Sequence, residues 1–252
     1  MNGQLVPQFD GVSRPYTYYD NKDSFYETGT TFSNTVSFST AGDNGNTRFS
    51  LTNLDNDDIS PNSTLDRNSI GINTSQNVGK NIRIDANLKY LLEDQSGNPR
   101  LSDGPGNANW IINHTSPSVD VNWGKGPNGD GRNDDLSEYQ MTPSIYIQNQ
   151  WFAQNYYVND SEKERFIGSI NMRWDLTDWL YARARVGADR YDLHRTQSEP
   201  FGTGYKPQGG INHYKLAFKQ FDSDFFLGTD NLSLTDDVAL TAFVGVGSNV
   251  QE

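Results

Sequence analysis

The connections between strand-like segments alternate between short and long along the chain, and this order constrains the fold more than any other sequence feature. Short connections rich in turn-forming residues fall near 41–46, 78–81, 176–178 and 234–237. Long polar connections fall near 55–66, 94–163 and 196–211. In an up-and-down antiparallel sheet, this order puts every short turn at one end and every long loop at the other. A soluble sandwich has no reason to sort its loops in this way.

The segments between these connections alternate between apolar and polar residues with a period of two, which is typical of β-strands. Segment 82–92 is the clearest case, because every second residue from Ile82 to Leu92 is apolar while Arg83, Asp85 and Lys89 lie on the opposite face. Segment 213–233 is long enough to contain a β-bulge. The other strands are expected at 31–39, 47–53, 68–78, 165–175, 180–189 and 238–246.

The length of these segments favours a membrane-spanning sheet. Soluble strands average about 5–6 residues, whereas a strand of about 11 residues tilted near 45° spans roughly 26 Å, close to the apolar band of an outer-membrane barrel. Trp174 and Trp179 flank one short turn, where the aromatic girdle of such a barrel would lie. The expected fold is therefore all-β, with about eight up-and-down antiparallel strands of a transmembrane β-barrel. The alternative is a half-exposed sheet of a soluble sandwich.

Composition excludes several classes of protein. The chain has 20 basic and 32 acidic residues, a net charge of −12, which argues against a nucleic-acid partner. It contains no cysteine, so disulfides and thiolate chemistry are excluded. No segment approaches the ~18 apolar residues of a membrane-spanning helix. The first residues lack a signal-peptide pattern, so we expect either a cytosolic chain or part of a longer precursor.

The connection at 94–163 is long enough to be either functional or disordered. Its many aromatic residues favour a folded segment, with a short helix near Asn107 to Asn113. Tryptophan and tyrosine rings stack on sugars or on the apolar surface of a partner, so the loop supplies the candidate contact residues. Packing of the loop against itself explains the same residues equally well. The candidates are Trp110, Trp123, Trp151, Tyr156 and Tyr157.

Catalytic and metal chemistry find little support in the sequence. His114, His194 and His213 are far apart and lack metal-ligand spacing. The acidic stretch 128–135 lacks the spacing of a calcium loop, so a solvated acidic loop is the preferred interpretation and calcium the lesser alternative. We therefore expect no catalytic residue, no metal, no cofactor and no enzymatic activity.

Five segments carry a resemblance to a known family. They are 3–16 (GQLVPQFDGVSRPY), 25–34 (FYETGTTFSN), 48–50 (RFS), 59–68 (ISPNSTLDRN) and 165–180 (RFIGSINMRWDLTDWL). Together they resemble TonB-linked outer-membrane proteins of the SusC/RagA type, the nutrient importers of Bacteroidetes-like Gram-negative bacteria. The triplet Asp57-Asp58-Ile59 departs from the family, in which glycine usually precedes this isoleucine, and the departure concerns only the local turn.

The resemblance implies an architecture and a function. Such proteins have a 22-stranded barrel closed by an N-terminal plug domain, so residues 1–26 are expected to end the plug and residues 27–252 to form the first barrel strands, with a long extracellular loop at about 94–163. The implied function is import of oligosaccharides or peptides together with a SusD-like surface lipoprotein. Parts of the longer protein would contact the TonB-ExbB-ExbD complex, and outer-membrane lipid would surround the strands. The alternative function is a soluble all-β glycan- or protein-binding module or adhesin.

Overall fold

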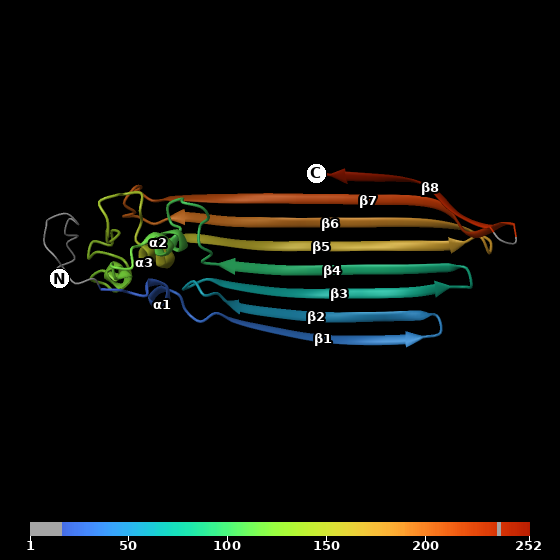
Figure 1. Cartoon of the computed structure of the whole chain (residues 1–252), viewed down its shortest axis with the longest axis horizontal. Helices are drawn as coiled ribbons and strands as arrows, with labels where there is room; N and C mark the ends of the chain where they lie inside the picture. Colours follow the sequence, from blue (N-terminus) through green and yellow to red (C-terminus); the bar gives the residue numbers. More distant parts are fainter. Residues whose placement is uncertain (1–16, 236–237) are drawn as a thin grey trace.

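The computed structural model describes residues 17–235 and 238–252. In this part of the chain the dominant feature is one sheet of eight antiparallel strands, in which each strand pairs with the strand that precedes it in the sequence (Figure 1). The strands are β1 (Thr30–Gly42), β2 (Gly45–Asp57), β3 (Thr64–Val78), β4 (Ile82–Ser96), β5 (Val158–Asp175), β6 (Leu180–Glu199), β7 (Gly210–Thr235) and β8 (Val238–Gln251).

The register of the sheet keeps the apolar residues of neighbouring strands on one face. Phe38 lies opposite Phe49, Phe49 opposite Ile72, and Ile72 opposite Leu88. This row continues the two-residue periodicity of the sequence from strand to strand, because a shift by one residue would reverse the faces. The register between β7 and β8 shifts after Thr229, which confirms the irregularity expected in this long segment.

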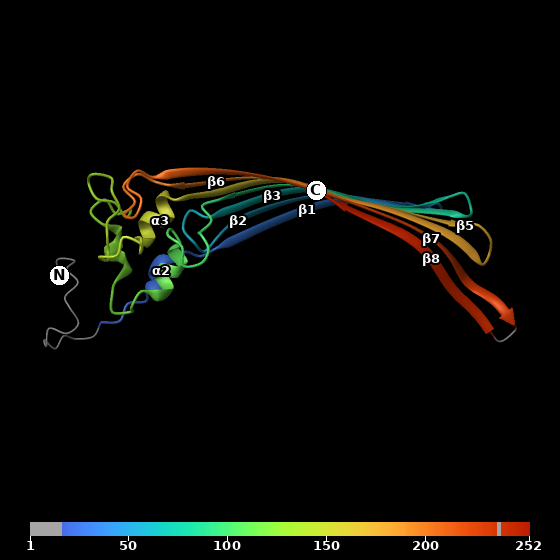
Figure 2. The same cartoon turned by 90° about the horizontal axis from the view of Figure 1, so that it is seen from above.

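The apolar face of the sheet is open. Val36 is 72% exposed and Val246 is 70% exposed, and within residues 17–235 and 238–252 no second sheet covers them. Figure 2 shows the sheet from its side as a single curved layer. An apolar face of this extent is stable against lipid rather than water, and curvature of the layer suits an arc of a barrel wall. The described strands thus confirm the all-β, up-and-down segment of a transmembrane barrel, and they do not form the two-layered sandwich that was the alternative.

The connections are sorted as the sequence predicts. Residues 43–44, 79–81 and 176–179 form short turns at one end, whereas 58–63, 97–157 and 200–209 connect strands at the other (Figure 1). The expected turn at 234–237 includes two residues that lie outside the described ones. The long loop is shorter than the predicted 94–163, because β4 and β5 extend beyond their alternating segments and remain paired up to Gln95 and Ser161.

The helices lie at the long-loop end of the sheet (Figures 1 and 2). None in the described part of the chain is long and apolar enough to cross a membrane. The helix expected near 107–113 is present as α2, and the others were not predicted. These short elements are α1 (Asn21–Phe25), α2 (Ala108–His114), the 3-10 helix η1 (Val121–Lys125) and α3 (Gln150–Tyr156).

The chain enters the sheet from the long-loop end. β1 runs from there toward the short turns, and the preceding residues 17–29 lie beside the loop helices (Figure 1). Of the segment 1–26 predicted to end the plug, residues 1–16 fall outside the described part. The predicted boundary between residues 26 and 27 stays a prediction, whereas the described residues place α1 with the loops.

Candidate functional site

The polar face of the sheet carries ion pairs that cross from strand to strand. The guanidinium of Arg67 on β3 donates from Nε to Glu93 on β4 at 2.7 Å, and Lys163 on β5 donates to the same carboxylate at 3.2 Å. Farther along, Arg165 on β5 pairs with Asp189 on β6. Opposite charges on facing strands stabilise a sheet and suit a water-filled lumen. The polar face of the sheet therefore carries paired opposite charges.

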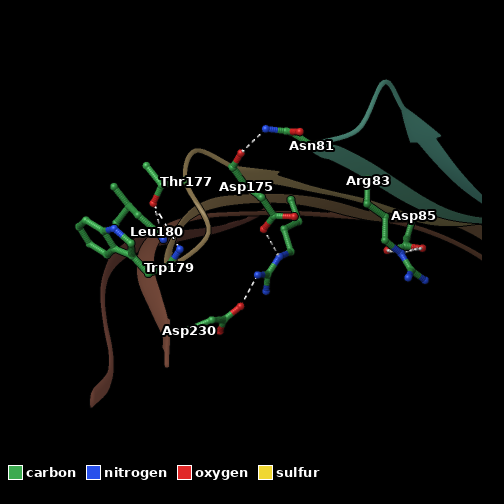
Figure 3. A network of polar contacts seen from close by, with 9 residues as sticks. Asn81, Arg83, Asp85, Asp175, Thr177, Trp179, Leu180 and Asp230 are labelled. Carbon is green, nitrogen blue, oxygen red and sulfur yellow. Dashed lines mark hydrogen bonds and ion pairs between the residues drawn. The ribbon is translucent and has the colours of Figure 1, made fainter. Parts of the chain in front are cut away.

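A second polar network secures the short-turn end (Figure 3). Asp175 accepts a hydrogen bond from Arg173 at 2.8 Å, and Arg173 also pairs with Asp230 on β7. The side chain of Asn81 donates to the carbonyl of Asp175 at 3.1 Å, which joins two neighbouring turns. Trp179 lies beside this network and is about half exposed, as a residue at the edge of an apolar band would be.

At the opposite end, the loop helices and the segment before β1 form a small folded unit, which we call the cap (residues 17–29, 97–157 and 200–209). Its core contains Phe25, Ala108, Ile112 and Val121, with Trp151 packed against it. The ring of Phe25 meets that of Trp151 edge to face at 5.1 Å. In the described residues no second layer covers the sheet, so the apolar core lies in the cap.

Three of the five predicted contact residues hold the cap together. Trp151 donates from Nε1 to the carbonyl of Val121 at 2.9 Å. Tyr156 donates its hydroxyl to Asp130. The ring of Tyr157 is 7% exposed, and the guanidinium of Arg100 lies 5.0 Å from its centroid. In these three positions the aromatic ring packs the loop against itself.

The other two predicted residues lie on α2 and η1. Trp110, on α2, is half-buried and stacks on His114 with 4.4 Å between ring centroids. Trp123, on η1, is exposed. The structure therefore places all five residues in the cap, with Trp123 exposed and Trp110, Trp151 and Tyr156 partly buried. Their role in contacting a substrate or partner stays a prediction.

Glu138 and Asn149, which are not among the predicted site residues, organise the cap. The carboxylate of Glu138 is 2% exposed and accepts the backbone N–H of Asn149 at 2.6 Å and that of Gly204 at 2.8 Å. It thereby ties the loop 97–157 to the loop 200–209. Burial raises the pKa of Glu138, although the two N–H donors oppose the rise. Asn149 begins α3 by accepting the N–H of Trp151 at 2.8 Å.

The acidic stretch 128–135 uses its oxygens locally. Asp130 accepts hydrogen bonds from the backbone of Arg132 and the hydroxyl of Tyr156, and Asp135 accepts from Ser137. The hydrogen bonds from Ser137 lower the pKa of Asp135, because they stabilise its ionised form. In residues 17–235 and 238–252, no group of three or more acidic or histidine side chains is placed to hold a metal ion.

With this geometry established, comparison with known proteins defines the class of fold. No known protein family matches the sequence, and no curated protein matches it. The solved structure of the RagAB peptide transporter is similar, with a TM-score of 0.64 and 16% identity over 93% of this chain and 27% of that chain. The RagAB peptide importer in its closed-closed state gives a TM-score of 0.63, 15% identity and coverage of 93% and 27%. The same importer in its open-open state gives a TM-score of 0.62 and 16% identity over 93% of this chain and 26% of that chain.

These likenesses concern the fold. Nearly the whole of this chain superimposes on a segment of a much longer protein, since it spans only about a quarter of the RagAB chains that it matches. The resemblance to the SusC/RagA type, first seen in short sequence segments, is thus confirmed at the level of the fold. The described sheet has the fold of one segment of those structures, with the cap at its long-loop end.

Proposed function

We propose that this chain forms part of the barrel wall and the external cap of a TonB-dependent outer-membrane importer. The single observation that carries the proposal is the two-sided sheet: one face is apolar and uncovered, and the other is lined by ion pairs. A sheet of this kind separates lipid from a hydrated lumen. The likeness to RagAB supports the same interpretation. No bond-making or bond-breaking step is assigned to the chain.

The finer parts of the proposal follow the resemblance. Peptides or oligosaccharides would pass through the completed barrel, a SusD-like lipoprotein would sit on the cap, and TonB-ExbB-ExbD would act through other parts of the protein. Residues 17–26 belong with the external cap in this proposal, because Phe25 is buried in its core. A plug end in residues 1–16 stays a prediction. The setting is the outer membrane of a Gram-negative, Bacteroidetes-like cell.

Membrane fractionation and uptake test the proposal together. The complete protein that carries this chain should remain in the membrane pellet after alkaline carbonate washing and should require detergent for extraction. Cells should lose growth on oligopeptides or oligosaccharides as the only nutrient when either this protein or TonB is deleted. A protein that stays soluble without detergent would instead support the binding module or adhesin.

A further inference from the structure

A pocket of about 340 Å³ lies inside the cap, between α2 and the segment 141–150. Its size is at the lower end of the range of small-molecule sites. Most of its wall is apolar, so it favours an apolar ligand over a hydrated one. The apolar lining residues are Trp110, Ile111, Val119, Met141 and Ile147.

The pocket also has six polar lining residues, none of them a carboxylate, lysine or arginine: His114, Thr115, Ser116, Thr142, Gln148 and Gln150. Both polar atoms of the Gln148 side chain are hydrogen-bonded. Its Oε1 accepts the N–H of Gly106 at 3.1 Å, and its Nε2 donates to the carbonyl of Ile145 at 2.9 Å. Gln150 is 1% exposed and donates to Val121 at 2.8 Å, but its Oε1 has no hydrogen-bond partner among the described residues. Because that oxygen has almost no accessible surface, a ligand in the pocket meets the apolar lining rather than this acceptor.

The walls of the pocket are fixed before any ligand binds. The N–H of Trp110 is held by the side chain of Asn107, which begins α2, and its ring stacks on His114. On the other side, Asn149 is anchored by Glu138 between the two lining glutamines. Little side-chain entropy is therefore lost when a ligand enters.

We propose that this pocket binds one neutral side chain of an extended peptide, either aromatic or long aliphatic. This inference rests on the proposed function and narrows its substrate class from oligosaccharides or peptides to peptides with an apolar residue. A sugar ring would place several hydroxyl groups against a wall whose exposed surface is mostly apolar, and each hydroxyl left unpaired would weaken binding. A charged side chain would find no carboxylate, lysine or arginine among the lining residues. An aromatic or long aliphatic side chain fits better, because it presents an apolar surface to this wall.

The test uses the complete protein in detergent micelles and three dye-labelled probes. The probes are a pentapeptide with one central tryptophan among glycines, the same peptide with alanine at the centre, and maltopentaose. Fluorescence anisotropy should show that the tryptophan peptide binds more tightly than the other two. Trp110→Ala should weaken its binding roughly tenfold or more, because it removes the aromatic wall. Trp123→Ala is the matched control, and it should leave the affinity within about twofold, since Trp123 does not line the pocket.

A second variant separates loss of the pocket from loss of the fold. Val119→Phe places a larger side chain in the pocket lining without removing any lining residue. It should weaken binding of the tryptophan peptide as much as Trp110→Ala does, while hydrogen exchange of the cap stays unchanged. Equal affinity for all three probes, or unchanged affinity in both pocket variants, would overturn the inference. Tighter binding of maltopentaose that Trp110→Ala abolishes would also overturn it, while leaving an importer of glycans intact. Conversely, a protein that binds the peptide at this pocket but supports no TonB-dependent uptake would sink the proposed function alone.

Discussion

Arg165 on β5 makes a two-pronged ion pair with Asp189 on β6, with Nε 2.9 Å from Oδ1 and Nη2 2.5 Å from Oδ2. Both side chains project from the polar face, and both are only partly exposed. Two parallel hydrogen bonds fix the geometry better than one, so this pair should contribute more than an ordinary surface pair. Arg83 and Asp85 offer a contrast, because they lie on one strand and are more exposed (Figure 3).

A double-mutant cycle measures this difference. Arg165→Ala, Asp189→Ala and the double variant should give a coupling free energy of about 0.5–1 kcal/mol. The same cycle on Arg83 and Asp85 should give about 0.2 kcal/mol or less, because solvent screens that pair. Urea titration of the complete protein refolded into phospholipid vesicles provides the values. Equal coupling in the two pairs, or coupling that does not fall in high salt, would contradict the role assigned to the Arg165–Asp189 pair.

Neighbouring residues on β5 test which face meets lipid. Ile170 lies between Ala86 and Val186 on the apolar face, whereas Ser169 points to the polar face. Ile170→Arg should destabilise the folded barrel by about 2–4 kcal/mol, because it places a charge in the apolar band. Ser169→Arg is the matched control and should change the free energy of unfolding by about 0.5 kcal/mol or less. If the two substitutions had similar costs in the vesicle assay, the assignment of faces would be wrong.

The strands could be predicted because every second residue faces lipid and is apolar, which gives the sequence a period of two. The pattern ends where the membrane would end, but the backbone pairing does not. β4 was predicted to stop at Leu92, yet Glu93 and Asp94 still pair with β5, and β6 continues from Asp189 to Glu199. Outside the apolar band both faces meet water, so alternation no longer reports the strand.

The cap was less predictable, because its order comes from contacts distant in sequence. α1 and α3 are too short to show helical periodicity, although Asp20 and Asn149 are recognisable as residues that begin a helix. Glu138 is 66 positions from Gly204, and nothing in the sequence joins them. The aromatic content of the loop predicted that it folds, but not that Trp151 would pack against its core while Trp123 stays exposed.

The attachment of α1 to the cap yields a third prediction. Phe25 is 1% exposed and contacts Trp151, so Phe25→Ala should release the segment before β1 with a local cost of about 3–5 kcal/mol. Hydrogen exchange over residues 17–29 should then accelerate while exchange in β4 to β6 stays slow. Phe201→Ala is the matched control, because that ring is 75% exposed in another cap loop. Protection of residues 17–29 that survives Phe25→Ala would show that another contact holds them.

Glu138 links the two cap loops through both of its carboxylate oxygens, so replacing one of these acceptors with a donor should loosen them. Glu138→Gln replaces one carboxylate oxygen with an amide donor, which leaves one of the N–H groups of Asn149 and Gly204 without an acceptor. The expected cost is about 1–3 kcal/mol, seen as faster proteolysis within 97–157 and 200–209. Asp134→Asn removes an exposed carboxylate from the same loop and should leave proteolysis unchanged. Faster cleavage in both variants would show that general charge, rather than this contact, stabilises the cap.

The same carboxyl should make the cap sensitive to pH. Burial raises the pKa of Glu138 above its ordinary value of 4.5, so the closed cap binds a proton more readily than the opened one. The closed state therefore gains stability as the pH falls through the raised pKa, keeps the full gain below 4.5, and loses it as the pH rises again. Proteolysis of the cap loops, measured with an acid-active and a neutral protease at overlapping pH values, should slow on acidification. Glu138→Gln should flatten this profile because it removes the titrating group. A profile that is equally steep in the variant would assign the pH dependence to other groups.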